Sequence, residues 1–165
     1  MTQYLTNYEQ MFDVGSHQLA FYGGLMKQDI YTTGYSKSKP SQIADLVESL
    51  NAILVDIRFS ASSRNPAWSK TSLEKLLGGR YVHCPAFGNA LYRSGGMQIA
   101  DYAAGKALLE PIERPVILLC ACHSPDGCHR TVVGTMLQRD GFTVREVNAT
   151  RSGDLAKREI WSSTL

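Results

Sequence analysis

Residues 115–120 read PVILLC, and residues 52–57 read AILVDI. Apart from Asp56, both runs are apolar and rich in branched side chains, which is typical of strands that are buried on both faces of a parallel sheet. Segments with a helical spacing of apolar residues separate such runs, as in residues 40–50. Strands that alternate with helices favour βαβ units. We therefore expect one open, mostly parallel, five-stranded α/β sheet with helices on both faces.

The same patterns predict where each element lies. Strands are expected at residues 30–35, 52–57, 81–84, 115–120 and 142–147, and helices at 40–50, 73–77, 98–110 and 131–139. Ser38 is expected to cap the first helix and Gly78 to end the second, because serine and glycine favour these positions. Trp68 is expected to pack under the loop that follows the second strand. The α/β domain then spans residues 30–150, between an N-terminal extension (1–29) and a C-terminal tail (151–165).

The composition is that of one ordinary globular domain. Of the 165 residues, 44% are hydrophobic and 19% are charged. The formal net charge is only +2, and Lys and Arg are spread along the chain without a long run. This balance gives no support for a nucleic-acid-binding surface. Positive charge that serves a ligand must therefore be local to a site.

The sequence also bears on the compartment. No apolar stretch reaches the roughly 18 residues that a membrane-spanning helix needs, and the first residues show no signal-peptide pattern. Three of the four cysteines fall within residues 120–128, which is poor placement for a disulfide framework. We expect a cytoplasmic protein with reduced thiols. Its N-terminal extension is rich in aromatic residues, so we expect it to pack on the domain or on a second subunit of a homo-oligomer.

Polar residues gather directly after the predicted strands. Because open α/β sheets bind ligands at the carboxyl ends of their strands, these residues are candidates for a single site. The candidate ligand-binding residues are Tyr35, Ser36, Arg58, Arg64, Asn65, Lys70 and Arg130, and the candidate catalytic residues are Asp56, His83, Cys128 and His129. Structural roles stay open beside these, with Asp56 as an ion-pair partner of Arg58 and His83 as a core histidine.

Cys128, His129 and Arg130 begin the fourth predicted helix. The first turn of a helix leaves backbone N–H groups free and carries the positive end of the helix dipole, so it accommodates an anion. An arginine in that turn offers a planar pair of donors to phosphate or carboxylate. The alternative is that His129 and Arg130 only cap and solvate the start of the helix.

The loop before this helix holds many metal ligands, namely Cys120, Cys122, His123, Cys128 and His129. The C-x-C spacing lacks the two-residue gap of zinc fingers, and no second ligand pair follows. We therefore expect no metal and no other cofactor. A strand that ends in cysteine before an Arg-bearing helix is also similar to Cys-dependent phosphatases and sulfurtransferases. Because the spacing from Cys122 or Cys128 to Arg130 does not match the phosphatase pattern, this chemistry stays an alternative.

Four segments together resemble the domain of unknown function 488 family. They are TTGYS at 32–36, VDIRFSASSRNPAWSK at 55–70, YVHCPAFGN at 81–89 and LLCACHSPDGCHR at 118–130. The resemblance covers residues 30–148 and implies an α/β domain whose shared polar positions are Arg58, Arg64, Asn65, Lys70, His83, Cys128, His129 and Arg130. It implies no particular reaction. The N-terminal extension, Cys84 and Cys122 depart from the family pattern.

We expect the site to bind an anionic, nucleotide-like small molecule, and three hypotheses follow. In the first, the arginines hold the anion, His83 or His129 acts as acid or base, and Asp56 orients one of these side chains, so that a group is hydrolysed or transferred. In the second, the protein binds or sequesters a nucleotide-derived metabolite or signal unchanged, as phages do against host signalling. In the third, Cys128 or Cys122 carries sulfurtransferase-like or phosphatase-like chemistry.

Overall fold

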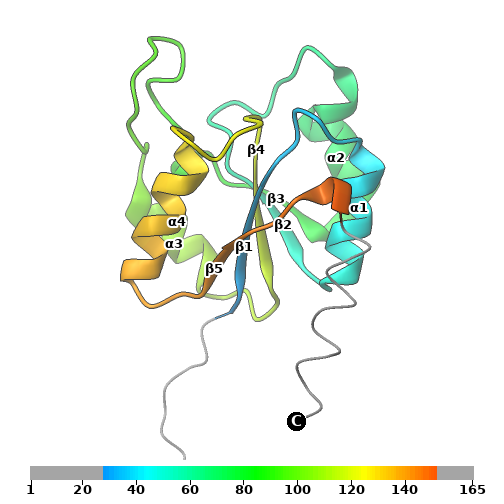
Figure 1. Cartoon of the computed structure of the whole chain (residues 1–165). Coiled ribbons are helices and arrows are strands. Elements are labelled where there is room, and N and C mark those ends of the chain that lie inside the picture. Colours follow the sequence, from blue (N-terminus) through cyan, green and yellow to red (C-terminus); the bar gives the residue numbers. More distant parts are fainter. Residues whose placement is uncertain (1–27, 152–165) are drawn as a thin grey trace, which may run out of the picture.

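The computed structural model describes residues 28–151, so most of the expected N-terminal extension and C-terminal tail lies outside the described residues. Five strands form one entirely parallel sheet in the order β3-β2-β4-β1-β5 (Figure 1). The strands are β1 (Ile30–Gly34), β2 (Ile53–Asp56), β3 (Tyr81–His83), β4 (Val116–Cys120) and β5 (Val144–Glu146). The helices are α1 (Pro40–Ser49), α2 (Lys70–Leu77), α3 (Tyr102–Leu109) and α4 (His129–Arg139), with short 3₁₀ helices η1 (Pro66–Trp68), η2 (Gly78–Arg80), η3 (Pro85–Phe87) and η4 (Ala149–Arg151). The predicted α/β fold is confirmed.

Helices cover both faces of the sheet, α1 and α2 on one side and α3 and α4 on the other (Figure 1). Strand β4 shows how the two cores are separated, because all of its residues are buried and alternate between the faces. Ile117 and Leu119 pack in the core under α1 and α2, whereas Val116 and Leu118 pack in the core under α3 and α4. A strand buried on both faces needs the continuous apolar run that the sequence shows.

The connections leave neighbouring strands toward opposite faces of the sheet. The chain after β1 leads to α1 on one face, and the chain after the adjacent strand β4 leads to α4 on the other. Loops that diverge in this way open a crevice at the carboxyl ends of the strands, which is where open α/β sheets bind ligands. The residues that follow β1, β2, β3 and β4 therefore meet at one edge of the sheet.

Several element boundaries differ from the prediction, each for a local reason. Lys39, not Ser38, is the N-cap of α1, and Gln42 accepts a hydrogen bond from its backbone N–H at 2.8 Å. Helix α3 starts at Tyr102, later than predicted, because the Asp101 side chain accepts a hydrogen bond from Ala104 N and caps it there. Helix α4 starts at His129, two residues before Thr131, so Cys128 is its N-cap and His129 and Arg130 lie in its first turn, as expected for this segment.

Two predictions about single side chains have opposite outcomes. Trp68 is buried as expected and stacks on Tyr35 with ring centroids 4.2 Å apart. The spacing of Leu73, Leu76 and Leu77 predicts one apolar face for α2, yet Leu76 is 46% exposed, and Leu73 is the buried residue of this helix. Leu77, four residues after Leu73, packs partly buried against the same core, so the buried stripe of α2 runs through these two leucines and leaves Leu76 at its edge.

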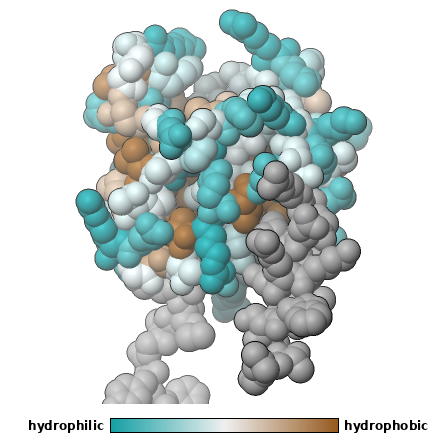
Figure 2. All heavy atoms as spheres, in the orientation of Figure 1, coloured by the Kyte–Doolittle hydropathy of each residue, from teal (hydrophilic) through white to brown (hydrophobic). Residues whose placement is uncertain are grey.

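The surface of the described chain is mixed in polarity. On the face seen in Figure 2, hydrophilic side chains are interspersed with small apolar areas. Among residues 28–151, no helix is both long and apolar enough to cross a membrane.

Truncation of Leu118 tests the central position of β4. This side chain is fully buried between β1 and β2, so Leu118→Ala is expected to lower the free energy of unfolding by about 2–5 kcal/mol through lost burial and a residual cavity. Leu76→Ala is the matched control and is expected to change it by less than about 0.5 kcal/mol. Urea denaturation measures both variants, and equal losses would contradict the assignment of the core.

Candidate functional site

A pocket of about 490 Å³ lies at the carboxyl ends of the strands. All four loops that follow β1 to β4 contribute to its wall. The lining residues are Tyr35, Arg58, Phe59, Ser60, Ser62, Asn89, Tyr92, Gly95, Gly96, Met97, Ala121, Cys122, Gly127, Cys128 and His129. Its size and its mixed apolar and polar lining are typical of a small-molecule site.

A second pocket of about 550 Å³ adjoins the first and shares Phe59, Ser60, Ser62 and Tyr92 with it. Its remaining wall includes Lys70, His83 and Arg93. The basic residues of the two linings together are Arg58, Lys70, His83, Arg93 and His129, and neither lining contains an aspartate or a glutamate. We call these two pockets together the double pocket. The charge of its walls favours a negatively charged ligand.

Asp56 and Arg58 form a buried pair at the end of β2. The Arg58 Nε donates to the Asp56 carboxylate at 2.8 Å, and Nη1 donates to the Tyr35 hydroxyl at 3.2 Å. Tyr81 donates its hydroxyl to the same carboxylate at 2.8 Å. Burial lowers the pKa of Arg58, but the hydrogen bond and charge of Asp56 outweigh it and raise the pKa above its ordinary value. Asp56 therefore pairs with Arg58, which is the structural role that the sequence left open for it, and Arg58 keeps its positive charge.

His83 and His129 are both half-buried on the pocket walls, and each ring faces a backbone carbonyl. The His83 Nε2 lies 2.9 Å from the Arg58 oxygen, and the His129 Nε2 lies 3.1 Å from the Ile57 oxygen. Because a carbonyl oxygen only accepts hydrogen bonds, Nε2 of a neutral ring carries the proton in both cases. The Nδ1 atoms are then left as acceptors.

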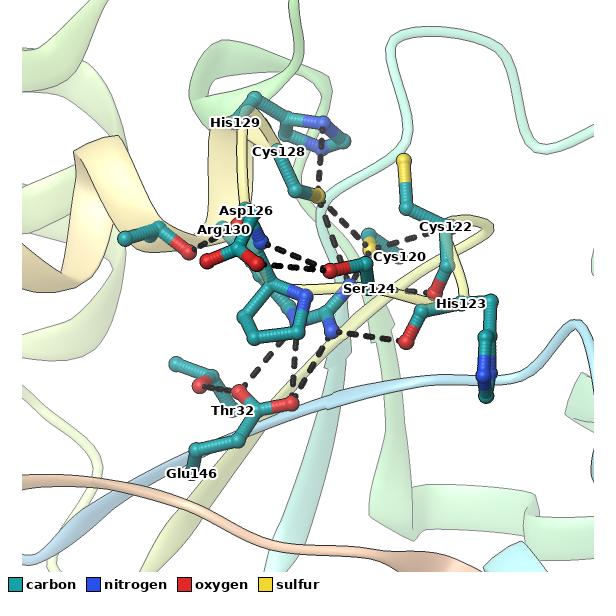
Figure 3. Close-up of polar contacts among 12 residues, drawn as sticks. Thr32, Cys120, Cys122, His123, Ser124, Asp126, Cys128, His129, Arg130 and Glu146 are labelled. Atoms are coloured by element: carbon teal, nitrogen blue, oxygen red, sulfur yellow. Dashed lines mark hydrogen bonds and ion pairs between the residues drawn. The ribbon is translucent and has the colours of Figure 1, made fainter.

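The Arg130 guanidinium lies beneath the loop that joins β4 to α4 and is 1% exposed (Figure 3). It donates to the backbone oxygens of Cys122 and His123 at 3.0 and 3.3 Å, and it pairs with Glu146 at 3.0 Å. Nη1 also lies 3.0 Å from the Cys120 sulfur. Burial lowers the pKa of Arg130, but the hydrogen bond and charge of Glu146 outweigh this effect and raise the pKa above its ordinary value. The structure thus places Arg130 among contacts that hold the loop, and the double pocket is lined by other residues.

Two glycines allow the loops to approach one another closely. A Cβ atom on Gly34 would lie 1.7 Å from the Cys122 oxygen and 2.9 Å from Nη1 of Arg130. A Cβ atom on Gly88 would lie 2.5 Å from the Cα of Phe59. Only glycine fits where backbone atoms approach so closely. Gly34 and Gly88 therefore fix how tightly the loops close around the site.

Three cysteine sulfurs meet at the end of β4. The Sγ atoms of Cys120, Cys122 and Cys128 all lie within 4.8 Å of one another, and Cys120 and Cys128 are 3.2 Å apart. Interactions with the other two thiols lower the pKa of the Cys122 thiol to about 3, and the Arg130 charge contributes. The same contacts raise the pKa of Cys120 strongly, and burial adds to this. Cys120 and Cys128 are buried, whereas Cys122 is exposed.

The structure distributes the other predicted ligand-binding residues around the site. Lys70 lies on the wall of the second pocket and pairs with Glu74 at 3.6 Å. Arg64 and Ser36 are exposed and line neither part of the double pocket. Asn65 caps η1, since its side chain accepts a hydrogen bond from Ala67 N at 3.1 Å.

Residues that the sequence did not single out complete the walls. Phe59 and Tyr92 are 43% and 46% exposed, and their ring centroids lie 6.1 Å apart at the mouth of the pocket. Aromatic residues exposed in polar loops are a signal for a ligand surface, and this signal could have identified both. Glu146, on the edge strand β5, also escaped the sequence analysis because nothing in its local pattern indicates a partner more than ten residues away.

Comparison with known proteins yields no match: no family model, curated protein or solved structure is similar enough to this chain to be reported.

Removal of the Arg130 side chain tests its place in the loop. Arg130→Ala leaves the Cys122 and His123 oxygens without their donor, so the free energy of unfolding is expected to fall by about 1–3 kcal/mol. Arg139→Ala, in the last turn of the same helix and exposed, is the control and is expected to stay within about 0.5 kcal/mol. Chemical denaturation compares them. Similar stability of the two variants would show that the loop does not depend on Arg130.

Proposed function

We propose that the protein binds an anionic, nucleotide-like small molecule in the double pocket and hydrolyses it or transfers a group from it. The observation that carries the proposal is the charge of the walls, where the cationic side chains of Arg58, Lys70 and Arg93 lie with no carboxylate among the lining residues. A charged group of the ligand would lie toward Arg58 and the start of α4, where the first backbone N–H groups have no acceptor within the helix.

The apolar part of the ligand would lie at the mouth of the pocket. Phe59, Tyr92 and Met97 are all exposed by more than two-fifths there, which is unusual for large apolar side chains around one opening. Aromatic faces of this kind stack on nucleobases with little regard to base identity. Arg93 donates to the Tyr92 hydroxyl at 2.9 Å, and its guanidinium lies over the ring at 5.5 Å from the centroid. The double pocket therefore has one wall that suits a base and another that suits a charged group of the same ligand.

The proposed chemistry depends on His83. Its Nε2–H is directed to the Arg58 carbonyl, so Nδ1 is free to accept a proton from water or from an acceptor hydroxyl as it attacks the ligand. The same contact holds the ring against the end of β2, where Arg58 begins the loop that forms one wall. A binding protein that returns the ligand unchanged is the competing reading, and turnover decides between them.

The first test is incubation of the full chain with nucleotides, cyclic dinucleotides and ADP-ribose derivatives, followed by mass spectrometry of the solution and of the denatured protein. Tyr92→Ala is expected to weaken the affinity for the compound that binds by about 1–3 kcal/mol, since it removes the stacking surface. Leu91→Ala is the matched control, because Leu91 is similarly exposed and lies outside both linings. Absence of binding across the panel, or equal losses in the two variants, would contradict the proposal.

Turnover is tested separately from binding. His83→Gln is expected to retain the ligand and to lose about 100- to 10,000-fold in rate, because the proton acceptor is gone. His123→Gln is the control, since His123 is exposed and lies outside the double pocket. Liquid chromatography of product over time measures both. Recovery of intact ligand from the wild-type protein, with no product at any time, would establish the binding protein instead.

A further inference from the structure

The loop between β4 and α4 folds back so that the sulfurs of three cysteines lie close together; in Figure 3 those of Cys120 and Cys128 face each other, and the Cys122 side chain is turned away from them. A tetrahedral zinc ion with Zn–S bonds of about 2.3 Å holds its sulfurs about 3.8 Å apart. The sulfurs of Cys120, Cys122 and Cys128 lie within 4.8 Å of one another, with the closest pair at 3.2 Å. Small movements of these side chains would therefore bring all three sulfurs to metal-binding distance.

His129 is a candidate fourth ligand next to Cys128, although its ring does not lie within 4.8 Å of all three sulfurs. Its Nδ1 lies 3.9 Å from the Cys128 sulfur, and its Nε2–H is directed to the Ile57 oxygen at 3.1 Å. Histidines that bind metals usually donate the other ring N–H to a carbonyl or carboxylate in this way, which fixes the tautomer and the ring orientation. The lone pair of Nδ1 is then on the side of Cys128.

The surroundings can carry the charge of three thiolates. The Arg130 Nη1 lies 3.0 Å from the Cys120 sulfur and 3.5 Å from the Cys128 sulfur, and the Cys122 N–H lies 3.3 Å from the Cys120 sulfur. Three thiolate charges would be matched by a divalent ion together with one guanidinium. Glu146 pairs with the opposite side of Arg130 and is 41% exposed, so solvent screens its charge.

We propose that Cys120, Cys122, Cys128 and His129 form a site for a thiophilic divalent ion, Zn²⁺. Sequence spacing argued against a metal because a C-x-C pair lacks the usual gap, but the fold brings Cys128 back from eight residues along the chain to complete the set. Two of its sulfurs are buried, while Cys122 and His129 also line the first pocket, so the ion would lie in the pocket wall. This inference does not rest on the proposed nucleotide function.

The test uses the full chain, kept reduced, stripped of metal with a chelator and titrated with Co²⁺. We expect one equivalent to bind with thiolate charge-transfer absorption and the intense visible bands of tetrahedral cobalt, and Zn²⁺ to displace it. Cys122→Ala and Cys128→Ala are expected to lose this uptake. Cys84→Ala is the matched control, because Cys84 is the other buried free thiol and lies outside the cluster. Because Cys122 is exposed, its variant is expected to fold even if the buried Cys128 variant does not.

Three outcomes would overturn the inference. Reduced wild-type protein that shows no thiolate–cobalt absorption would exclude the site, and so would uptake by Cys122→Ala or Cys128→Ala equal to that of Cys84→Ala. His129→Gln is expected to weaken Zn²⁺ affinity by at least about 10-fold, with His123→Gln as the control. Equal affinities of the two variants would show that His129 is not the fourth ligand. All of these readouts are free of nucleotide, so they succeed or fail independently of the ligand panel.

Discussion

The buried guanidinium of Arg130 ties together the parts of the structure that form the site. It comes from the first turn of α4, reaches under the preceding loop to two backbone oxygens and a thiol, and pairs with Glu146 on the edge strand β5. A buried charge without partners would cost several kcal/mol, so the loop, α4 and β5 must keep this arrangement together. Among the described residues, no buried side-chain nitrogen or oxygen lacks a partner. The strand end and the loop are therefore specified as one unit.

This use of Arg130 changes how the charge of the site is understood. An arginine whose donors are directed to backbone oxygens and to Glu146 has little left to offer a ligand, and Arg58 is similarly engaged with Asp56. The positive charge of the double pocket then comes from Lys70 and Arg93 at the surface of its walls, with Arg58 contributing from below. Buried pairs fix the geometry, and exposed basic groups remain to neutralise an anion.

The sequence was sufficient for the fold and for the edge of the sheet at which the first pocket lies, but not for the arrangement of side chains there. Continuous apolar runs such as 115–120 identify central parallel strands, and the polar residues after them must meet at one edge. The direction of each side chain could not be predicted in the same way. Arg130 was expected on the pocket wall, yet its position depends on Glu146 and on the absence of a Cβ at Gly34, which are remote in sequence. Tyr92 is an aromatic residue in a polar loop, which marks it as a candidate, but the loop has no periodicity that would fix where its ring lies.

The cysteine cluster can be recognised only in the folded chain, because the residues that position it are also far apart in the sequence. Spacing rules for metal sites describe ligands on short turns, where local backbone geometry alone sets the distances. Here the distance between Cys120 and Cys128 is set by the strand end, by the carbonyl of Cys122 that Gly34 admits, and by the N–H groups that Arg130 directs to the loop. The entropy of ordering these thiols is therefore lost when the domain folds and not when a ligand binds, and such preorganisation favours any ion or substrate that meets the three sulfurs together.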